Sequence, residues 1–299
     1  MSSAPKVWLA GARGMLGSVI ATKLSERSIP FVGTDVDLDV ANAEAVDAFL
    51  RSERPSVILN AAAYTRVDDA ESQAADAFRV NAEGATTLAR GARALGAAYL
   101  YFSTDYVFDG RAQSPYVEDA PCAPVSVYGR SKREGEIGVL RTLEGARGYV
   151  LRTSWLFGEN GPSFVRTMLT LMREREELRV VRDQVGRPTY THDLADVALR
   201  LVGLGGAAAP PGIYHFANSG PTSWYDFAQG IRQTALRLGA SLRVTSILPV
   251  STAEFPRPAP RPAYSVLDTR RIEQVLGITP RHWAEALGEH LARELRGQQ

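Results

Sequence analysis

Tyr128 and Lys132 stand four positions apart, and this spacing suggests a proton donor for the reduction of a carbonyl group. On a helix, residues four apart lie on the same face, about 6 Å from each other. A lysine ammonium near a phenol stabilises the phenolate, so a tyrosine with an ordinary pKa of about 10 can give up its proton at neutral pH. Lys132 could also reach a ribose hydroxyl of a bound cofactor. Thr104, just after the apolar run 97–102, is expected to hydrogen-bond the substrate oxygen from the other side.

Lysine is rare in this chain, so the spacing of Tyr128 and Lys132 would rarely arise by chance. The three lysines are Lys6, Lys23 and Lys132, against a combined 34 lysines and arginines. With the 11 tyrosines of the chain, about 0.1 pairs of this spacing are expected by chance. A compact ammonium whose pKa can be adjusted suits the chemistry better than a guanidinium. The alternative is a solvated tyrosine and lysine on the surface of a helix.

A glycine-rich turn near the start of the chain has the order that dinucleotide binding requires. An apolar strand at 6–10 runs into glycines at 11, 14 and 17, and a helical stretch follows to residue 27. Glycines permit a tight turn and let a pyrophosphate approach the backbone, while the helix N-terminus faces the phosphates. The alternative is a structural turn without a cofactor. The residues expected at the pyrophosphate are Gly11, Arg13, Gly14, Met15, Leu16 and Gly17.

A carboxylate follows where a ribose hydroxyl needs an acceptor. The strand expected at 31–35 ends in Asp35, about 20 residues after the turn. Arg13 favours a cofactor with a 2′-phosphate and Asp35 one without, so we expect both NADPH and NADH to be usable. Arg13 could instead be a solvent-exposed loop charge, and Asp39 could be a helix cap. The further expected cofactor contacts are Asp39, Val40, Ala62, Ala63, Tyr64, Thr65 and Phe102, with Tyr128 and Lys132.

Alternating strand and helix patterns predict an α/β fold with a doubly wound, Rossmann-like parallel sheet. Buried strands are expected at 57–60, 97–103 and 149–155, and one long helix at 76–96. Ligands then bind at the carboxyl ends of the strands. From about residue 184 the alternation loosens. We therefore expect residues 1–183 to form mainly the nucleotide-binding domain and residues 184–299 mainly a smaller C-terminal substrate-binding portion, with chain crossovers between the two.

Two side chains outside the glycine turn are candidates for substrate contact. Trp155, after an apolar strand, could form a wall for a sugar or nicotinamide ring, or could be a buried structural tryptophan. Arg261 lies in the proline-rich run 256–262, where a guanidinium could bind a diphosphate in a fork. Its alternative is a solvent-exposed loop charge.

Composition excludes several classes of protein. The formal net charge is +1 and the isoelectric point is about 7.9, which gives no electrostatic basis for binding nucleic acid or an anionic membrane. Cys122 is the single cysteine, so there is no internal disulfide, and the four histidines lack metal-ligand spacing. The chain enters a strand after six residues and has no run of eighteen apolar residues. We therefore expect a cytoplasmic protein without a bound metal, as a monomer or homodimer.

These motifs, in this order, resemble the extended short-chain dehydrogenase/reductase family. The resemblance narrows over most of the chain to the dTDP-4-dehydrorhamnose reductases, through the words Asn60-Ala-Ala-Ala-Tyr-Thr65, Ser103-Thr-Asp-Tyr-Val-Phe108, Arg152-Thr-Ser-Trp155 and Arg261-Pro-Ala-Tyr-Ser265. It implies NADPH- or NADH-dependent reduction of the C4 ketone of dTDP-4-dehydro-β-L-rhamnose, the last step of dTDP-L-rhamnose biosynthesis.

Residue by residue, the resemblance implies a role for each matching position. It makes Tyr128 the proton donor, with Lys132 and Thr104 as its supports, and it places Thr104, Asp105 and Trp155 at the sugar. Dehydratases of the family have Asp-Glu after the threonine, whereas here Asp105 precedes a tyrosine, which argues against dehydration. Some resembled reductases bridge a dimer through Mg²⁺ held by a glutamate in the first helix. Val19 occupies the matching position here, so a magnesium-bridged dimer is not expected.

Two other functions remain open at this stage. One is a reductase or epimerase of another nucleotide-linked deoxyhexulose, since one fold hosts many reactions. An epimerase would keep its nicotinamide through turnover, whereas a reductase consumes it. The other is a non-catalytic, NAD(P)-binding regulatory subunit, against which the intact set of Tyr128, Lys132 and Thr104 argues.

Overall fold

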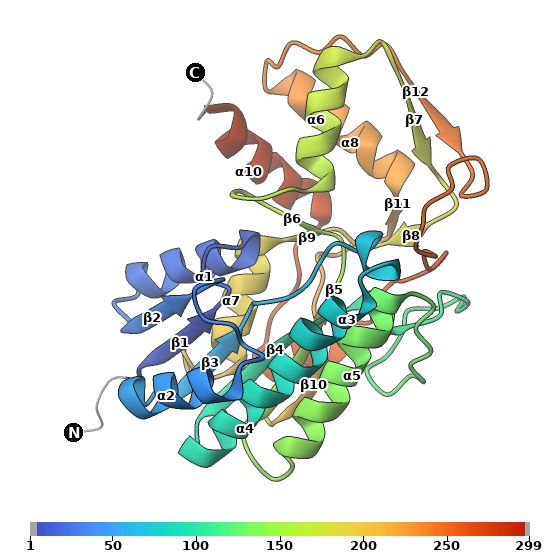
Figure 1. Ribbon diagram of the computed structural model, residues 1–299. Helices are drawn as coiled ribbons and strands as arrows, with labels where there is room; N and C mark the ends of the chain where they lie inside the picture. The colour runs from blue at the N-terminus through green and yellow to red at the C-terminus, as the bar shows by residue number, and fades with distance from the viewer. Residues whose placement is uncertain (1–4, 297–299) are drawn as a thin grey trace.

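The computed structural model describes residues 5–296, and its centre is a six-stranded sheet (Figure 1). The strands lie in the order β10-β5-β4-β3-β1-β2, and all neighbours are parallel. They are short and largely apolar because helices cover both faces. The doubly wound α/β fold expected from the sequence is confirmed. The strand bounds are β1 Val7–Ala10, β2 Phe31–Thr34, β3 Val57–Asn60, β4 Ala98–Thr104, β5 Gly148–Thr153 and β10 Gly212–His215.

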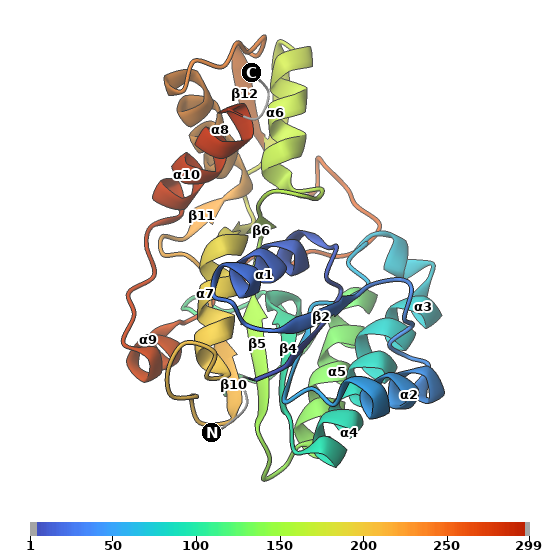
Figure 2. The ribbon, with the colours of Figure 1, turned by 90° about the vertical axis from the view of Figure 1, so that its left-hand side faces the viewer.

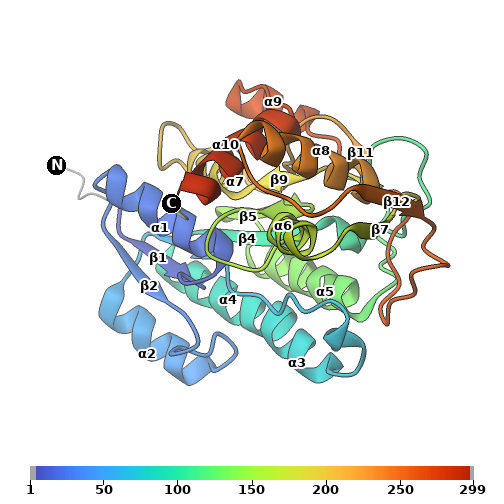
Figure 3. The ribbon, with the colours of Figure 1, turned by 90° about the horizontal axis from the view of Figure 1, so that it is seen from above.

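Helices lie on both faces of this sheet (Figures 2 and 3). Helices α1 and α7 pack on one face and share a core with the sheet. Helices α2, α4 and α5 pack on the opposite face in a second core. The helix bounds are α1 Met15–Glu26, α2 Ala43–Glu53, α3 Ala74–Phe78, α4 Ala85–Leu95, α5 Val127–Thr142, α7 Thr191–Leu201 and α9 Arg270–Leu276. Within residues 5–296, no helix combines the length and apolar content needed to cross a membrane.

A smaller lobe lies beyond one end of the sheet (Figure 1). Its helices and the parallel pair β7–β12 bury a core of their own. The bounds in the lobe are α6 Phe164–Glu174, β7 Glu177–Val181, α8 Trp224–Arg237, β12 Ser246–Val250 and α10 Trp283–Arg296. Two short pairs connect lobe and sheet, β6 Leu156–Phe157 with β9 Thr189–Tyr190, and β8 Val185–Gly186 with β11 Thr222–Ser223.

The chain crosses between the sheet and the lobe more than once. Helix α6 and strand β7 come before residue 183 but belong to the core of the lobe. Helix α7 and strand β10 come after residue 183, yet α7 packs on α1 and β10 extends the sheet beside β5. The expected parts, 1–183 and 184–299, are thus interleaved, and the active-site strands and the lobe are joined through several segments.

Helical structure runs without a break from residue 74 to residue 95, close to the single helix expected at 76–96, but it is not regular throughout. The structure has α3, then a wide π-helical turn at Arg79–Gly84 (η2), then α4. Asn81 lies in this turn. Its side-chain oxygen accepts a hydrogen bond from the backbone N–H of Tyr64, and its side-chain nitrogen donates to the backbone oxygen of Tyr64 and, at 2.9 Å, to the hydroxyl of Ser131 on α5. Such turns often mark functional sites. The hydrophobic pattern of the sequence does not reveal a π-helical turn, because the turn is stabilised by these contacts with residues distant in the sequence.

Candidate active site

Close backbone contacts shape the glycine turn between β1 and α1. Gly11 has φ +78°, and a Cβ there would lie 2.5 Å from the nitrogen of Ala62. A Cβ on Gly17 would lie 1.9 Å from the Gly11 carbonyl oxygen, so Gly17 allows the helix to approach the strand. A Cβ on Gly14 would make an ordinary 3.4 Å contact. Gly14 caps α1 without a side chain, which leaves the first N–H groups of the helix available to a phosphate.

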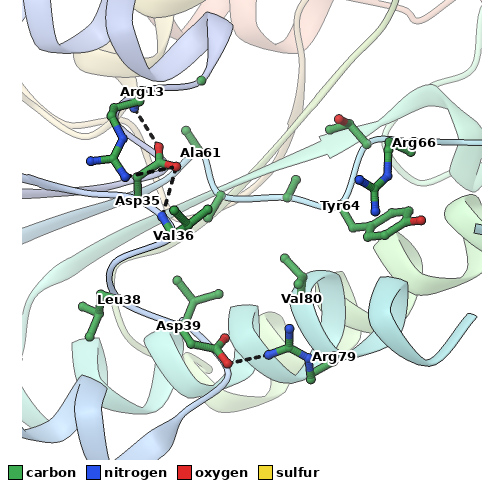
Figure 4. A pocket seen from close by; sticks show the side chains of 16 residues that line it. Arg13, Asp35, Val36, Leu38, Asp39, Ala61, Tyr64, Arg66, Arg79 and Val80 are labelled. Carbon is green, nitrogen blue, oxygen red and sulfur yellow. Dashed lines mark hydrogen bonds and ion pairs between the residues drawn. The ribbon is translucent and has the colours of Figure 1, made fainter. Parts of the chain in front are cut away.

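A cavity of about 620 Å³ opens beside this turn, and Figure 4 shows the side chains around it. Its size and its position at the carboxyl ends of β1, β2 and β3 fit a dinucleotide. Ten lining residues are among those expected from the sequence: Gly11, Arg13, Gly14, Asp35, Asp39, Val40, Ala62, Ala63, Tyr64 and Thr65. Six were missed: Val36, Leu38, Ala61, Arg66, Arg79 and Val80.

Some expected cofactor residues lie outside this lining. Leu16 is in the core between α1 and the sheet, and Gly17 packs against Gly11. Cofactor contact stays a prediction for all the expected residues, both those in the lining and those outside it. The full set outside the lining is Met15, Leu16, Gly17, Phe102, Tyr128 and Lys132.

Arg13 and the acidic end of β2 form one hydrogen-bonded group. The Arg13 backbone N–H donates to Asp35 Oδ2 at 2.8 Å, and its guanidinium lies 3.0 Å from Asp37 Oδ1. The Arg13 side chain is 65% exposed and that of Asp37 57%. Backbone hydrogen bonds, with help from Arg13, hold the pKa of Asp37 below its usual value. Arg13 is therefore solvent-exposed and also paired with a carboxylate at the cavity rim.

Two of the missed residues are arginines on the other wall of the cavity. Arg79 forms an ion pair with Asp39, as Figure 4 shows, and the Arg66 guanidinium lies 4.8 Å from the centre of the Tyr64 ring. Nothing in the local sequence singles them out, because a lone arginine in an arginine-rich chain carries little information. The π-helical turn brings Arg79 to the cavity.

Tyr128 lies in the first turn of α5, against the end of β4. Ser126 caps this helix through its hydroxyl, which accepts from the backbone N–H of Gly129. Burial raises the pKa of Tyr128 above its usual value, while a hydrogen bond with Thr104 acts in the opposite direction. The structure thus brings together two of the three expected catalytic residues. A phenol with a raised pKa remains protonated at neutral pH, and giving up this proton requires a nearby positive charge that stabilises the phenolate.

Lys132 is buried one turn further along α5. Its amino group donates to the Phe102 carbonyl oxygen at 2.6 Å and lies 4.1 Å from the centre of the Tyr101 ring. Burial lowers the pKa of Lys132 to about 7, against the opposing charge of Glu136. The amino group is therefore held at the end of β4, and its expected action on the Tyr128 phenol stays a prediction.

Asp105 begins a short 3₁₀ turn (η3, Asp105–Val107) directly after β4. It is 1% exposed, and its Oδ1 accepts from the Thr104 hydroxyl at 3.0 Å. Burial raises the pKa of Asp105 to about 6, although hydrogen bonds from Ser265 and Thr104 partly oppose this. Asp105 also contributes to the raised pKa of Tyr128. It therefore lies beside Tyr128, and its expected contact with a sugar stays a prediction.

Trp155 occupies a constrained position between the sheet and the lobe. Its backbone has φ +47°, in the left-handed region that a bulky residue rarely adopts. The ring stacks on Trp224 with centroids 3.4 Å apart and planes inclined by 6°. On its other side, a Cβ on Gly186 would lie 2.5 Å from Trp155 Cε2. Trp155 is thus partly structural, and its contact with a sugar stays a prediction.

A second cavity, of about 610 Å³, lies between the sheet domain and the lobe. Arg261 lines it and is not a solvent-exposed loop charge, because its side chain is 17% exposed and forms a 2.9 Å ion pair with Asp68. Tyr106, from η3, also lines the cavity, and its ring lies edge-on to that of Tyr128 at 5.5 Å. The wall combines aromatic and cationic side chains, most of them missed from the sequence: Phe164, Trp224, Phe255, Arg175, Arg179 and Arg257.

A parallel sheet in this strand order, with a glycine turn at the dinucleotide-sized cavity, defines the class of dinucleotide-binding proteins with a doubly wound fold. The chain belongs to the family described as "RmlD substrate binding domain", whose model matches residues 5–296. The resemblance inferred from the sequence motifs is confirmed.

The chain is similar over nearly its full length to several named relatives. A dTDP-4-dehydrorhamnose reductase from Streptomyces griseus is 44% identical over 95% of this chain and 92% of the relative. A probable dTDP-4,6-dihydroxy-2-methyloxan-3-one 4-ketoreductase from Streptomyces antibioticus is 45% identical over 94% and 93%. A solved structure of dTDP-4-dehydrorhamnose reductase from Bacillus anthracis in complex with NADP is 36% identical, with a TM-score of 0.90 over 97% of this chain and 99% of that chain.

Proposed function

We propose that this chain reduces the C4 ketone of dTDP-4-dehydro-β-L-rhamnose with NADPH or NADH, giving dTDP-β-L-rhamnose in the last step of dTDP-L-rhamnose biosynthesis. The observation that carries this proposal is the placement of Tyr128 in the first turn of α5, where this helix packs against the end of β4 and against η3. The Tyr128 ring lies edge-on to Tyr106, which lines the second cavity, and the dinucleotide-sized cavity opens at the carboxyl ends of neighbouring strands. The full-length similarity to the Streptomyces griseus reductase supports the substrate.

The residues around the first cavity would hold the cofactor. The glycine turn and the N-terminus of α1 would bind the pyrophosphate, and Asp35 would accept a hydrogen bond from a ribose hydroxyl. Small side chains at Ala62 and Ala63 allow a ring to approach the end of β3. When bound, the reduced nicotinamide supplies a hydride to the ketone carbon.

The side chains of the chain then handle the proton. Tyr128 gives its phenolic proton to the ketone oxygen, which becomes the new hydroxyl, and the phenolate afterwards recovers a proton from water. Thr104 holds the phenol in place and bonds the same oxygen. The Lys132 ammonium, held at Phe102, lowers the cost of forming the phenolate.

The second cavity is suited to the nucleotide part of the substrate. Arg257 and Arg261 can bind a diphosphate, and Phe164 and Trp224 can pack against a base. Tyr106 connects this cavity to Tyr128, so a sugar extending from the diphosphate reaches the proton donor. Asp105 and Trp155 complete the expected sugar contacts.

A reductase of another dTDP-linked 4-keto sugar is the second candidate. The Streptomyces antibioticus ketoreductase, at 45% identity over almost the whole chain, supports it specifically. The chemistry at Tyr128 would be the same, and the sugar alone would differ.

The test is NADPH and NADH oxidation by purified protein with enzymatically made dTDP-4-dehydro-L-rhamnose. We expect one cofactor oxidised for each sugar reduced. Tyr128→Phe should bind cofactor normally, measured by quenching or enhancement of nicotinamide fluorescence, and lose turnover by about 10²-fold or more. Unchanged turnover in Tyr128→Phe would remove the assigned proton donor.

Other 4-keto sugars, tested in the same assay, separate the two candidates by their kcat/KM ratios. A protein that binds cofactor but oxidises it with none of these sugars would instead be an epimerase or a regulatory subunit. Product analysis distinguishes those two, because an epimerase converts its sugar without net loss of the reduced cofactor.

A further inference from the structure

Glu136 is a fully buried carboxylate one turn beyond Lys132 on α5. Its Oε1 accepts hydrogen bonds from Ser103 Oγ at 2.6 Å and from Arg152 Nε at 2.8 Å. Its Oε2 accepts from Arg152 Nη2 and Arg133 Nη1, both at 2.8 Å. A buried carboxylate is costly unless it is paired and hydrogen-bonded. Burial alone would raise the pKa of Glu136, but the bonds and charge of Arg152 outweigh it, and the pKa is lowered.

The donors to Glu136 come from the elements that carry the active-site residues. Ser103 precedes Thr104 at the end of β4, and Arg152 lies near the end of β5. Glu136 itself is on α5, four residues after Lys132. The carboxylate therefore joins α5, β4 and β5 near Tyr128. Each of its two oxygens accepts two hydrogen bonds.

Glu136 is the hydrogen-bonded negative partner of Arg152, and the charge of Glu118 also raises the pKa of this guanidinium. Arg152 further contacts the Glu118 carbonyl oxygen at 3.1 Å, His215 Nε2 at 3.2 Å and Cys122 Sγ at 3.3 Å, and its guanidinium carbon lies 5.1 Å from the centre of the Phe108 ring. Burial and the nearby guanidinium lower the pKa of His215 to about 3, so this ring is neutral. Burial raises the pKa of the Cys122 thiol, which is therefore also neutral at pH 7.

The same carboxylate acts on Lys132. Burial is the main influence on this amino group and lowers its pKa to about 7, and the charge of Glu136 is the influence that raises it. The amino group is surrounded by the Tyr101 ring and the Phe102 carbonyl oxygen. Without Glu136, burial would act unopposed, and the ammonium form would be lost at a lower pH.

We propose that Glu136 is a positioning residue of the reductase, whose carboxylate joins α5 to β4 and β5 and places a negative charge one helical turn from the Lys132 ammonium. This inference deepens the proposed function and rests on it, because the Lys132 ammonium matters to Tyr128 only if the protein reduces a ketone. It assigns to Glu136 a role in catalysis without contact with substrate or cofactor.

The first test is the pH profile of kcat/KM in Glu136→Gln. Glutamine keeps the shape and can still accept from Ser103, but it removes the charge. If the active form needs the Lys132 ammonium, the alkaline limb should move to lower pH. A move of about one pH unit makes the loss at about pH 8 up to about tenfold greater than at about pH 6. A uniform loss at all pH values would show a structural role and overturn the proposal.

A second readout does not depend on activity. The chain has three lysines, so NMR of ¹³C-labelled lysine gives three side-chain signals, and Lys132→Met identifies that of Lys132. We expect the Lys132 signal to titrate at lower pH in Glu136→Gln than in the natural protein. The matched control is Glu53→Gln, which removes the carboxylate 2.6 Å from Lys6 and should leave the Lys132 titration unchanged. An unchanged Lys132 titration in Glu136→Gln would also overturn the proposal.

Glu136→Gln leaves Arg152 buried without its counter-charge, so the single variant can unfold. The double variant Glu136→Gln with Arg152→Met removes both charges, a change that buried pairs often tolerate. We expect it to fold, and the Lys132 titration to remain shifted downward. Recovery of the natural titration in the double variant would overturn the proposal. If the natural protein oxidises no cofactor with any sugar, the proposed function fails, while the NMR result still decides whether Glu136 controls Lys132.

Discussion

Replacement of Asp37 by asparagine should raise the preference of this protein for NADPH over NADH. Asp37 Oδ1 lies 3.0 Å from the Arg13 guanidinium and also accepts from the backbone N–H of Asp35. The arginine that would bind a 2′-phosphate is therefore held by a carboxylate, and that carboxylate also repels the phosphate. Asparagine retains an acceptor for the Asp35 N–H but removes the charge. Asp35 remains in place to bind a ribose hydroxyl, so the use of NADH should change little.

The size of the effect follows from the exposure of the pair. The Arg13 and Asp37 side chains are 65% and 57% exposed, and exposed ion pairs change an equilibrium by a factor of about two to five. Loss of the repulsion between Asp37 and a 2′-phosphate adds a factor of similar size at low salt. We therefore expect the ratio of kcat/KM for NADPH to that for NADH to rise about four- to twenty-five-fold. High ionic strength should reduce the change.

The assay is the initial rate of oxidation of each cofactor at saturating sugar. Asp47→Asn is a matched control, because it removes the same charge from an exposed position on α2 outside the cofactor cavity. In an Arg13→Ala background, the part of the Asp37→Asn effect that comes from the freed guanidinium should disappear. An unchanged cofactor ratio in Asp37→Asn, or an equal change in Asp47→Asn, would refute the reasoning.

Two further changes test the turn and the buried carboxyl beside it. Gly17→Ala should lower the melting temperature and abolish cofactor binding, because its Cβ would lie 1.9 Å from the Gly11 carbonyl oxygen. A Cβ on Gly14 would lie 3.4 Å from the same oxygen, so Gly14→Ala should fold normally and only weaken cofactor binding. Burial raises the pKa of Asp105 from 3.8 to about 6, so the folded state binds a proton more readily than the unfolded chain and stability falls as pH rises through this window. Asp105→Asn should remove that slope in urea unfolding and raise the free energy of unfolding at neutral pH by about 3 kcal/mol, while impairing turnover; a slope that persists would contradict a raised pKa for this carboxyl.

Local patterns were enough to predict the elements at the centre of the site. The strand before Gly11, the strand ending at Thr104 and the helix carrying Tyr128 are all confirmed within a few residues. Each has a signal within a short window: an apolar run, a glycine turn or the four-residue spacing of Tyr128 and Lys132. Parallel strands then bring their carboxyl ends together without further information.

The residues that sequence reasoning missed reach the site through distant contacts. Arg79 faces the first cavity because of the π-helical turn, which is held by Tyr64 and Ser131. Trp224 meets Trp155 through packing across 69 positions of sequence. Neither contact leaves a periodic signal. The position of the second cavity likewise depends on how the lobe packs against the sheet. In the sequence, the only sign of this cavity was the prediction that Arg261, in the proline-rich run 256–262, binds a diphosphate.

Under the proposed function, the arrangement of the two cavities would let Tyr128 donate its proton to different sugars. One segment links them, since Tyr64, Thr65 and Arg66 line the first cavity and Asp68 lines the second. The cofactor turn, Tyr128 and Thr104 all belong to the sheet domain, whereas most of the second cavity is formed by the lobe. Lobe residues can therefore change the sugar accepted without disturbing the proton transfer. Relatives at 44% and 45% identity that bear the names of reductases of two different dTDP-sugars fit this division, and it directs a search for sugar specificity to the wall around Trp224 and Arg257.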